Sequence, residues 1–203
     1  MQHSFFNIPL SQYAELIPLL NSKSSFNIFT DKWTHLQTAR LPFFKYYRLL
    51  SAHTFSTTPP VTMHYLWNED NNDIIKMDGT RDAVFDNLEK LGLILNESTV
   101  VPYVRFVLDS IWTDKGNLRL VENMDEIELS ERPAAKDLRF LKRTIHPAMV
   151  SQTGDKYIIE AIIIYGTEVY GSTIALQPNG IFEFLSETEL KAGLNCVRVI
   201  FLE

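Results

Sequence analysis

The chain has 203 residues, of which 45% are hydrophobic and 22% are charged. This composition is typical of a globular protein and excludes long disordered segments. Asp and Glu number 25 against 19 Lys and Arg, giving a net charge of −6, and we expect no DNA partner because nucleic-acid binders normally carry a basic excess.

The first 60 residues are rich in aromatic side chains. They predict a short helix over residues 11–17, limited by Pro18, because proline removes a helical hydrogen bond. A second helix is expected over 31–39, with Thr30 as its N-cap. Residues 43–55 favour a strand because they are aromatic and apolar. The aromatic side chains themselves indicate either core packing or a protein–protein surface.

Two strands and two helices are expected next. Residues 61–67 and 74–77 read as the strands of a hairpin, with the polar turn 68–73 between them. Residues 80–91 predict a helix that ends at Gly92. The clearest helix covers 97–112, because four apolar side chains recur there at spacings of four, three and four: Val100, Val104, Val107 and Ile111.

The C-terminal half favours β-structure. A short strand at 118–122, a loop over 123–133 and a helix over 134–145 precede strands at 157–165, 169–176 and 181–185. A capping-box pattern from Ser186 to Glu189 predicts a short helix, and 196–202 reads as a final strand.

These elements predict an α+β fold with a mainly antiparallel sheet, the C-terminal meander, packed against two to four helices. We expect a single domain over 1–203. An N-terminal aromatic-rich subdomain over 1–60, or a boundary in the 123–133 loop, are the alternatives.

The chain's only cysteine, Cys196, excludes an intrachain disulfide. It lies in an apolar run, where a buried, inert thiol is the usual interpretation. The N-terminus lacks the features of a secretory signal, and no apolar run approaches the ~20 residues of a membrane span. We therefore expect a cytoplasmic protein without a membrane partner. The sequence leaves homo-oligomerisation open.

Asp78, Gly79 and Thr80 end an apolar segment and resemble the end of the Asp-x-Asp-Gly-Thr motif of haloacid-dehalogenase-like phosphatases. In this chain Lys76 stands at the position of the nucleophilic carboxylate, and an ammonium group cannot attack phosphorus or bind magnesium. That family also needs a parallel sheet, whereas a hairpin is expected here. We interpret Asp78-Gly79 as a turn.

Metal and cofactor sites receive little support. The acidic stretch 68–73 fails the calcium-loop pattern at its sixth and twelfth positions, which are Asp73 and Gly79. The five histidines include no closely spaced pair. His53 and His64 lie on adjacent predicted strands and could form an acid–base or metal pair, although ordinary structural roles are the simpler interpretation. We expect no cofactor and no metal.

One charge pattern stands out against the acidic background. In the predicted helix 134–145 and the residues before it, four cations follow spacings of four, three and four: Arg132, Lys136, Arg139 and Arg143. They form a basic stripe that could bind a phosphate, an acidic partner or RNA. A solvated outer helix face is the alternative.

The sequence contains no motif that combines a nucleophile, an activated base and an oxyanion site. The leading hypothesis is therefore a non-catalytic cytoplasmic interaction or regulatory module that binds a protein partner through the basic stripe. The alternative is a small-molecule-binding protein or enzyme with a pocket between a curved sheet and the 97–112 helix, lined by His53, His64, Tyr65, Arg105 and Asp109. Arg105 and Asp109, four residues apart, could instead form a surface ion pair.

Overall fold

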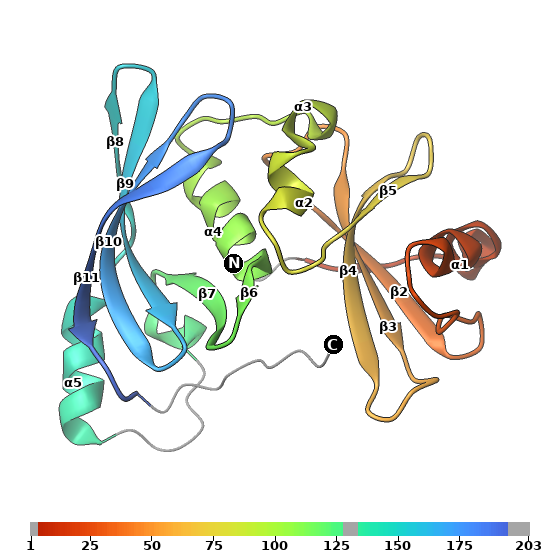
Figure 1. The fold of residues 1–203 in the computed structure, drawn as a ribbon, viewed down its shortest axis with the longest axis horizontal. Helices are drawn as coiled ribbons and strands as arrows, with labels where there is room; N and C mark the ends of the chain where they lie inside the picture. The colour runs from red at the N-terminus through yellow and green to blue at the C-terminus, as the bar shows by residue number, and fades with distance from the viewer. Residues whose placement is uncertain (1–3, 128–133, 195–203) are drawn as a thin grey trace. The chain divides into compact units, whose positions relative to one another are not determined.

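The computed structural model describes residues 4–127 and 134–194, and its contacts divide the chain into two compact units (Figure 1). Unit 1 comprises Met1–Asp78 and Glu89–Ile94, and unit 2 comprises Gly79–Leu88 and Leu95–Glu203. Each unit is built on an antiparallel sheet with helices. The predicted α+β class is confirmed, including the strand-rich C-terminal meander.

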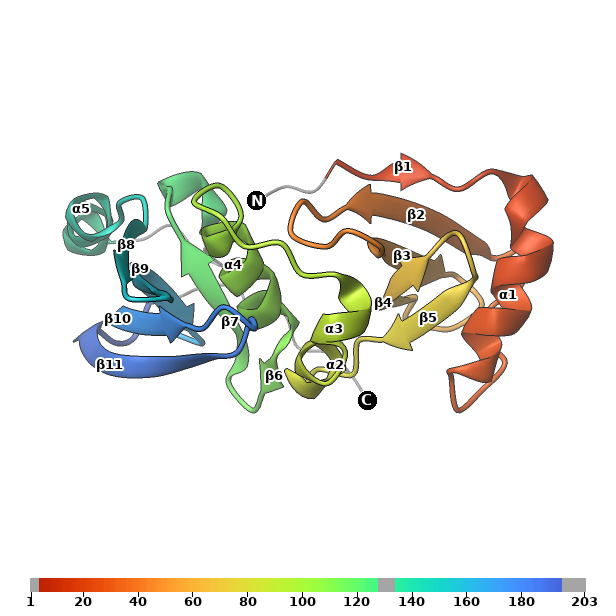
Figure 2. The same ribbon diagram turned by 90° about the horizontal axis from the view of Figure 1, so that it is seen from above.

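Unit 1 contains a five-stranded sheet in the order β1-β2-β3-β4-β5. One face packs against α1, and the shared core includes Leu16, Leu20, Leu36, Leu50 and Tyr65. Figure 2 shows α1 beside this sheet. The elements are β1 (Phe6–Asn7), η1 (Leu10–Gln12), α1 (Tyr13–Ser22), β2 (Thr34–Arg40), β3 (Arg48–Thr54), β4 (Val61–Asn68) and β5 (Asp73–Lys76).

The helix expected over 31–39 is wrong, because this segment forms β2. Thr34, Leu36 and Thr38 are all buried and alternate with more exposed residues, which is the period-2 pattern of a strand. The Thr30 hydroxyl does accept a hydrogen bond from the Trp33 backbone N–H, at 3.3 Å. It therefore stabilises the turn before β2 instead of a helix.

The first helix continues through Pro18 and ends at Ser22, so the prediction that Pro18 limits it is wrong. Pro18 lacks the N–H that would bond the Ala14 carbonyl, but both residues are exposed. Water can therefore satisfy that carbonyl. Burial of Leu16 and Leu20 against the sheet stabilises the helix on both sides of the proline.

The predicted hairpin 61–77 is confirmed by the pairing of β4 with β5. The helix expected over 80–91 is interrupted, and it forms α2 (Asp82–Phe85) and α3 (Leu88–Leu91). The Asn87 side chain donates to the Ala83 carbonyl at 3.0 Å, between the two helices. Gly92 has φ +69°, as expected for a glycine that follows a helix.

Unit 2 contains a six-stranded sheet with the path β11-β10-β9-β7-β6, and β8 pairs with the part of β9 that β7 leaves free. Its elements, after α2, are α4 (Val100–Ser110), β6 (Trp112–Thr113), β7 (Gly116–Val121), η2 (Met124–Glu126), α5 (Ala135–Thr144), β8 (Met149–Thr153), β9 (Lys156–Tyr165), β10 (Glu168–Leu176) and β11 (Phe182–Lys191).

Helices flank this sheet, with α5 and α4 on opposite sides (Figures 1 and 2). Leu141 of α5 packs with Ile162 and Ile164 of β9. The predicted stripe of α4 is buried at Val100, Val104 and Val107, which confirms that helix. None of the helices in the described ranges combines the length and apolar character that a membrane crossing requires.

The short helix expected at Ser186–Glu189 is wrong, because these residues continue β11 along β10. The capping box offers two local hydrogen bonds, whereas β10 offers a ladder of backbone bonds along the whole segment. The final strand expected at 196–202, with Cys196, lies outside the described residues.

Candidate functional site

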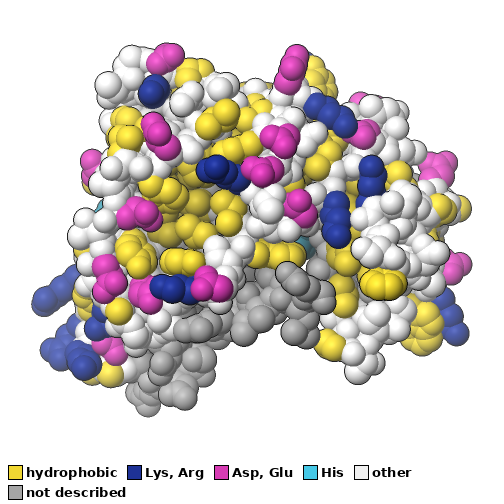
Figure 3. All heavy atoms as spheres, in the orientation of Figure 1, with side chains coloured by type: hydrophobic (Ala, Val, Ile, Leu, Met, Phe, Trp, Pro, Cys, Tyr) yellow, Lys and Arg dark blue, Asp and Glu magenta, His cyan; other side chains and the backbone are white. Residues whose placement is uncertain are grey.

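The predicted basic stripe lies on α5. Lys136, Arg139 and Arg143 are exposed, and so is Lys142, whereas Arg132 lies outside the described residues. We call Lys136, Arg139, Lys142 and Arg143 the basic face. Figure 3 shows a group of dark-blue side chains at the lower left, where Figure 1 places α5.

The other side of α5 holds the helix on the sheet of unit 2. Leu141 is fully buried, and Phe140 packs against the same core. Asp137, the only acidic residue of the helix, forms an ion pair with Lys191 Nζ of β11 at 2.8 Å. Lys191 Nζ also lies 5.3 Å from the centre of the Phe140 ring. The one carboxylate of α5 is therefore engaged by a cation from another element.

The basic face carries uncompensated charge. Within residues 4–127 and 134–194, none of its four cations takes part in an ion pair. Arg139 Nε donates to the Ala135 carbonyl at 3.3 Å, within the helix itself. A ten-residue helix with four exposed cations and one engaged carboxylate creates a local positive field in an acidic chain.

The residues of the alternative pocket are divided between the two units. His53, His64 and Tyr65 belong to the sheet of unit 1, whereas Arg105 and Asp109 belong to α4 of unit 2. Tyr65 is fully buried in the core with α1, and burial raises the pKa of its hydroxyl. Asp109 is exposed.

The strand register does not make His53 and His64 direct partners, although it places them diagonally on the same face of the sheet. His53 lies opposite Thr62 on β4 and opposite His35 on β2, whereas His64 lies opposite Ser51. The His53 Nδ1 atom contacts the Thr62 hydroxyl. Among the described residues, no three His, Cys, Asp or Glu side chains gather in a way that could hold a metal ion.

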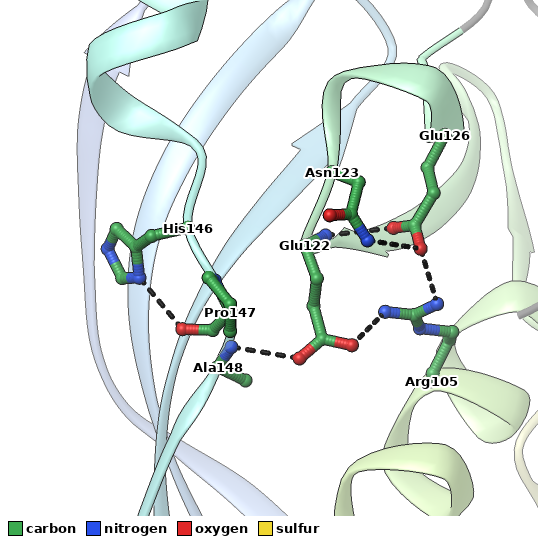
Figure 4. A network of polar contacts seen from close by, with 7 residues as sticks. All are labelled: Arg105, Glu122, Asn123, Glu126, His146, Pro147 and Ala148. Atoms are coloured by element: carbon green, nitrogen blue, oxygen red, sulfur yellow. Dashed lines mark hydrogen bonds and ion pairs between the residues drawn. The ribbon is translucent and has the colours of Figure 1, made fainter.

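Arg105 forms a buried ionic cluster, and not the ion pair with Asp109 that its spacing suggested. Its NH2 group lies 2.6 Å from Glu122 Oε2, and its NH1 group lies 3.0 Å from Glu126 Oε1. Glu122 Oε1 accepts from the Ala148 backbone N–H at 2.9 Å, and Glu126 Oε2 accepts from the Glu122 N–H at 2.8 Å. Figure 4 shows that these contacts connect α4, the end of β7 and the segment that enters β8.

The cluster also changes the acidity of Glu126. Burial by itself would raise the pKa of this carboxyl group, but the Glu122 backbone N–H and the Arg105 guanidinium lower it below the ordinary value of 4.5. The charged form is therefore favoured by folding. Because Arg105 is buried and both of its carboxylate partners also accept backbone N–H bonds, we interpret the cluster as structural.

Asp78 lies at the end of the segment that follows β5 and is exposed. The next residue, Gly79, has φ +84°, and a Cβ atom there would lie 2.8 Å from the Trp112 ring. Glycine is therefore required for both the backbone conformation and the close ring contact. The neighbouring strands β4 and β5 are antiparallel, unlike the parallel sheet that the phosphatase motif needs.

The aromatic side chains of the N-terminal part are divided between core and surface. Phe29, Phe43 and Tyr13 are buried, as the core interpretation expects. Phe26, Trp33 and Phe55 are exposed, and the Phe55 backbone N–H donates to the Trp33 carbonyl at 2.9 Å. The sequence alone could not separate these two groups, because none of the six residues lies in a strand and their exposure depends on how α1 and the connecting segments pack on the sheet.

The structure also reveals a hollow that the sequence did not predict. A cavity of about 370 Å³ lies at the connection between β2 and β3, with Arg40, Lys45 and Arg48 in its lining. A smaller one of about 170 Å³ lies beside β8 and β9. Arg40 and Arg48 stand at the two ends of the segment 41–47. If residues 34–40 had been predicted as a strand that pairs with the next one, these two arginines would have been expected to lie opposite each other.

Comparison of the chain with protein-family models, with curated proteins and with solved structures finds no significant match in any of the three.

Proposed function

We propose that this chain is a non-catalytic cytoplasmic interaction module, and that the basic face of α5 binds an acidic segment of a protein partner. The observation that carries this proposal is the charge balance of α5. Its four cations are exposed, and its only carboxylate is engaged by Lys191.

Two physical arguments favour an acidic protein segment as the ligand. Cations at spacings of three and four on one helix face can meet carboxylates along an extended or helical segment at the same time. The chain's net charge of −6 disfavours the long anionic backbone of a nucleic acid, which would be repelled outside the basic face. Binding that depends on exposed charges should weaken as salt rises, because the Debye length falls.

A matched pair of double variants tests the proposal. Arg139→Glu/Arg143→Glu changes two cations of the basic face, whereas Lys23→Glu/Lys32→Glu makes the same change in net charge at two exposed lysines of unit 1. The probe is a fluorescent ten-residue polyglutamate peptide, with polyglutamine as the neutral control. Binding is followed by fluorescence anisotropy at 50 and 200 mM salt.

We expect the wild type and the unit 1 variant to bind polyglutamate similarly. The α5 variant should lose roughly tenfold or more in affinity, which corresponds to about 1.4 kcal/mol. Equal affinities of the two variants would contradict the proposal. A photocrosslinking residue at position 139 in cells, compared with one at position 23, then tests whether a protein with an acidic segment is trapped only from α5.

A further inference from the structure

The cavity at the β2–β3 connection lies entirely within unit 1. Its volume of about 370 Å³ lies in the range of small-molecule sites. Seven of its lining residues are charged or are aromatic with a polar hydroxyl: Arg40, Lys45, Tyr46, Tyr47, Arg48, Glu69 and Asp70. None of its lining residues belongs to α5.

The strand pairing places two positive charges side by side. Arg40 of β2 and Arg48 of β3 are direct register partners, so their side chains leave the sheet on the same face. Like charges in this position destabilise a sheet. A protein keeps such an arrangement more readily where a ligand uses it, because functional sites are where folding preferences are commonly violated.

Only part of this charge is neutralised. Arg48 NH2 pairs with Glu69 Oε2 at 3.0 Å. Arg40 is exposed and makes no ion pair with any other residue that the structure describes. Lys45 Nζ lies 5.0 Å from the centre of the Tyr46 ring, which is a cation–π contact and leaves its charge in place. Three cations therefore face the cavity together with the carboxylates of Glu69 and Asp70.

The connecting segment is held in place by hydrogen bonds to residues 91 and 92. The Lys45 N–H donates to the Gly92 carbonyl at 3.0 Å, and the Tyr46 N–H donates to the Leu91 carbonyl at 3.3 Å. The Tyr46 ring rests so closely on Gly92 that a Cβ atom there would lie 2.5 Å from it. Tyr46 as a whole remains 48% exposed. A rigid lining lowers the entropy that binding would cost.

Tyr47 and Asp73 fix the end of the same segment. The Tyr47 hydroxyl donates to the Asp73 carboxylate, which also pairs with Lys90. Burial would raise the pKa of Asp73, but Lys90 and Tyr47 together lower it below its ordinary value. The carboxylate is therefore kept charged at neutral pH, and it holds the 41–47 segment against β5 and α3.

We infer that this cavity binds a small organic oxyanion, with its phosphate or carboxylate group held by Arg40 and Arg48. Guanidinium groups suit these anions because they donate two parallel hydrogen bonds to planar or tetrahedral oxygens. Lys45 adds a third positive charge. The exposed ring of Tyr46 offers a surface for a flat, apolar part of the ligand.

The test uses the full chain with ¹⁵N labelling and follows amide chemical shifts of unit 1. Inorganic phosphate, benzoate, phenyl phosphate and phenol are titrated separately. We expect phosphate and benzoate to shift amides of residues 40–48, phenyl phosphate to bind more tightly than phosphate, and phenol to have no effect. Comparison of phosphate with benzoate distinguishes the phosphate and carboxylate sources of the same chemistry.

Three variants assign the contacts. Arg40→Gln should weaken phenyl phosphate binding about tenfold, as expected for the loss of one charged hydrogen-bonding partner. Tyr46→Ala should remove the advantage of phenyl phosphate over phosphate. Lys23→Gln, an exposed lysine elsewhere in unit 1, is the control and should bind as the wild type does.

The inference is overturned if no anion shifts the amides of 40–48, or if Arg40→Gln binds as tightly as the wild type. Lys45→Gln provides a second test on the connecting segment in case Arg40→Gln alters the strands. The Arg40 variant should bind polyglutamate like the wild type, so failure of this site and failure of the α5 proposal are separable.

Discussion

Arg105 on α4 of unit 2 and Arg40 on β2 of unit 1 are both arginines next to other charged side chains, but the balance of charge around them is opposite. Arg105 is buried between Glu122 and Glu126, so one cation meets two carboxylates. Arg40 lies opposite Arg48, and the single nearby ion pair engages Arg48. The first arrangement stabilises a fold, whereas the second costs stability and is better explained by a ligand that supplies the missing negative charge.

The largest expected effect on stability comes from removing the buried positive charge of Arg105. Arg105→Leu leaves two mostly buried carboxylates without their partner, and we expect a loss of about 3–5 kcal/mol in the free energy of unfolding. Urea denaturation measures it. Arg143→Leu, an exposed arginine of the same unit, should change stability by no more than about 0.5 kcal/mol. Equal effects of the two substitutions would show that the Arg105 cluster is not structural.

Alanine substitutions at one glycine of each unit should differ in their cost to stability. Gly92 and Gly154 have similar positive φ values of +69° and +63°, so alanine at either position costs about 1–2 kcal/mol in backbone strain. A Cβ at Gly154 meets nothing within 4 Å, whereas one at Gly92 meets the Tyr46 ring. Gly92→Ala should therefore cost about 1 kcal/mol more.

Urea denaturation of both variants gives this difference, and hydrogen exchange of the β2 and β3 amides locates it. If Gly92→Ala and Gly154→Ala cost the same, the Tyr46 ring is free to move and the lining of the unit 1 cavity is not rigid. Gly92→Ala should also weaken binding of phenyl phosphate, because the ring is displaced.

A smaller, pH-dependent effect follows from Glu126. The pKa of Glu126 is lower in the folded state than the ordinary 4.5, so the charged form of this carboxyl group stabilises the fold. The stabilisation is complete above about pH 4.5. It is lost as the pH falls through the pKa of the folded state. Glu126→Gln should cost about 1 kcal/mol at pH 7.

The difference between the wild type and Glu126→Gln should shrink below pH 4.5. Denaturation midpoints measured from pH 7 to pH 3 check this. A difference that is constant over this range would mean that Arg105 does not depend on the charge of Glu126.

The smallest effect has the opposite sign. Arg40→Gln removes the repulsion between Arg40 and Arg48, so we expect unit 1 to gain about 0.2–1 kcal/mol at low salt without ligand. The gain should disappear at high salt, where exposed charges are screened. Thermal unfolding at 20 and 500 mM salt measures it, with Lys23→Gln as control. A loss of stability at low salt would contradict the repulsion on which the comparison depends.

Local sequence patterns were sufficient to predict those helices and strands whose structure depends mainly on their own residues. The buried stripe of α4, the β4–β5 hairpin and the β9 and β10 strands follow from periodicity and turn residues, and together they determine the α+β class. The cations of α5 were also recognisable, because helical spacing alone places them on one face. The single domain over 1–203 stays a prediction; the chain passes between the two compact units at residues 78–79, 88–89 and 94–95.

Tertiary pairing decided what local signals could not. Residues 34–40 form a strand because β3 supplies hydrogen bonds and α1 covers their apolar face, and Ser186–Glu189 extend β11 because β10 lies alongside. The partners of Arg105 are 17 and 21 residues away along the chain, and Arg40 meets Arg48 only through the register of two strands. The sequence by itself determined which segments are amphipathic, whereas the long-range register determined which charges meet, because a one-residue shift in pairing moves every side chain to the other face.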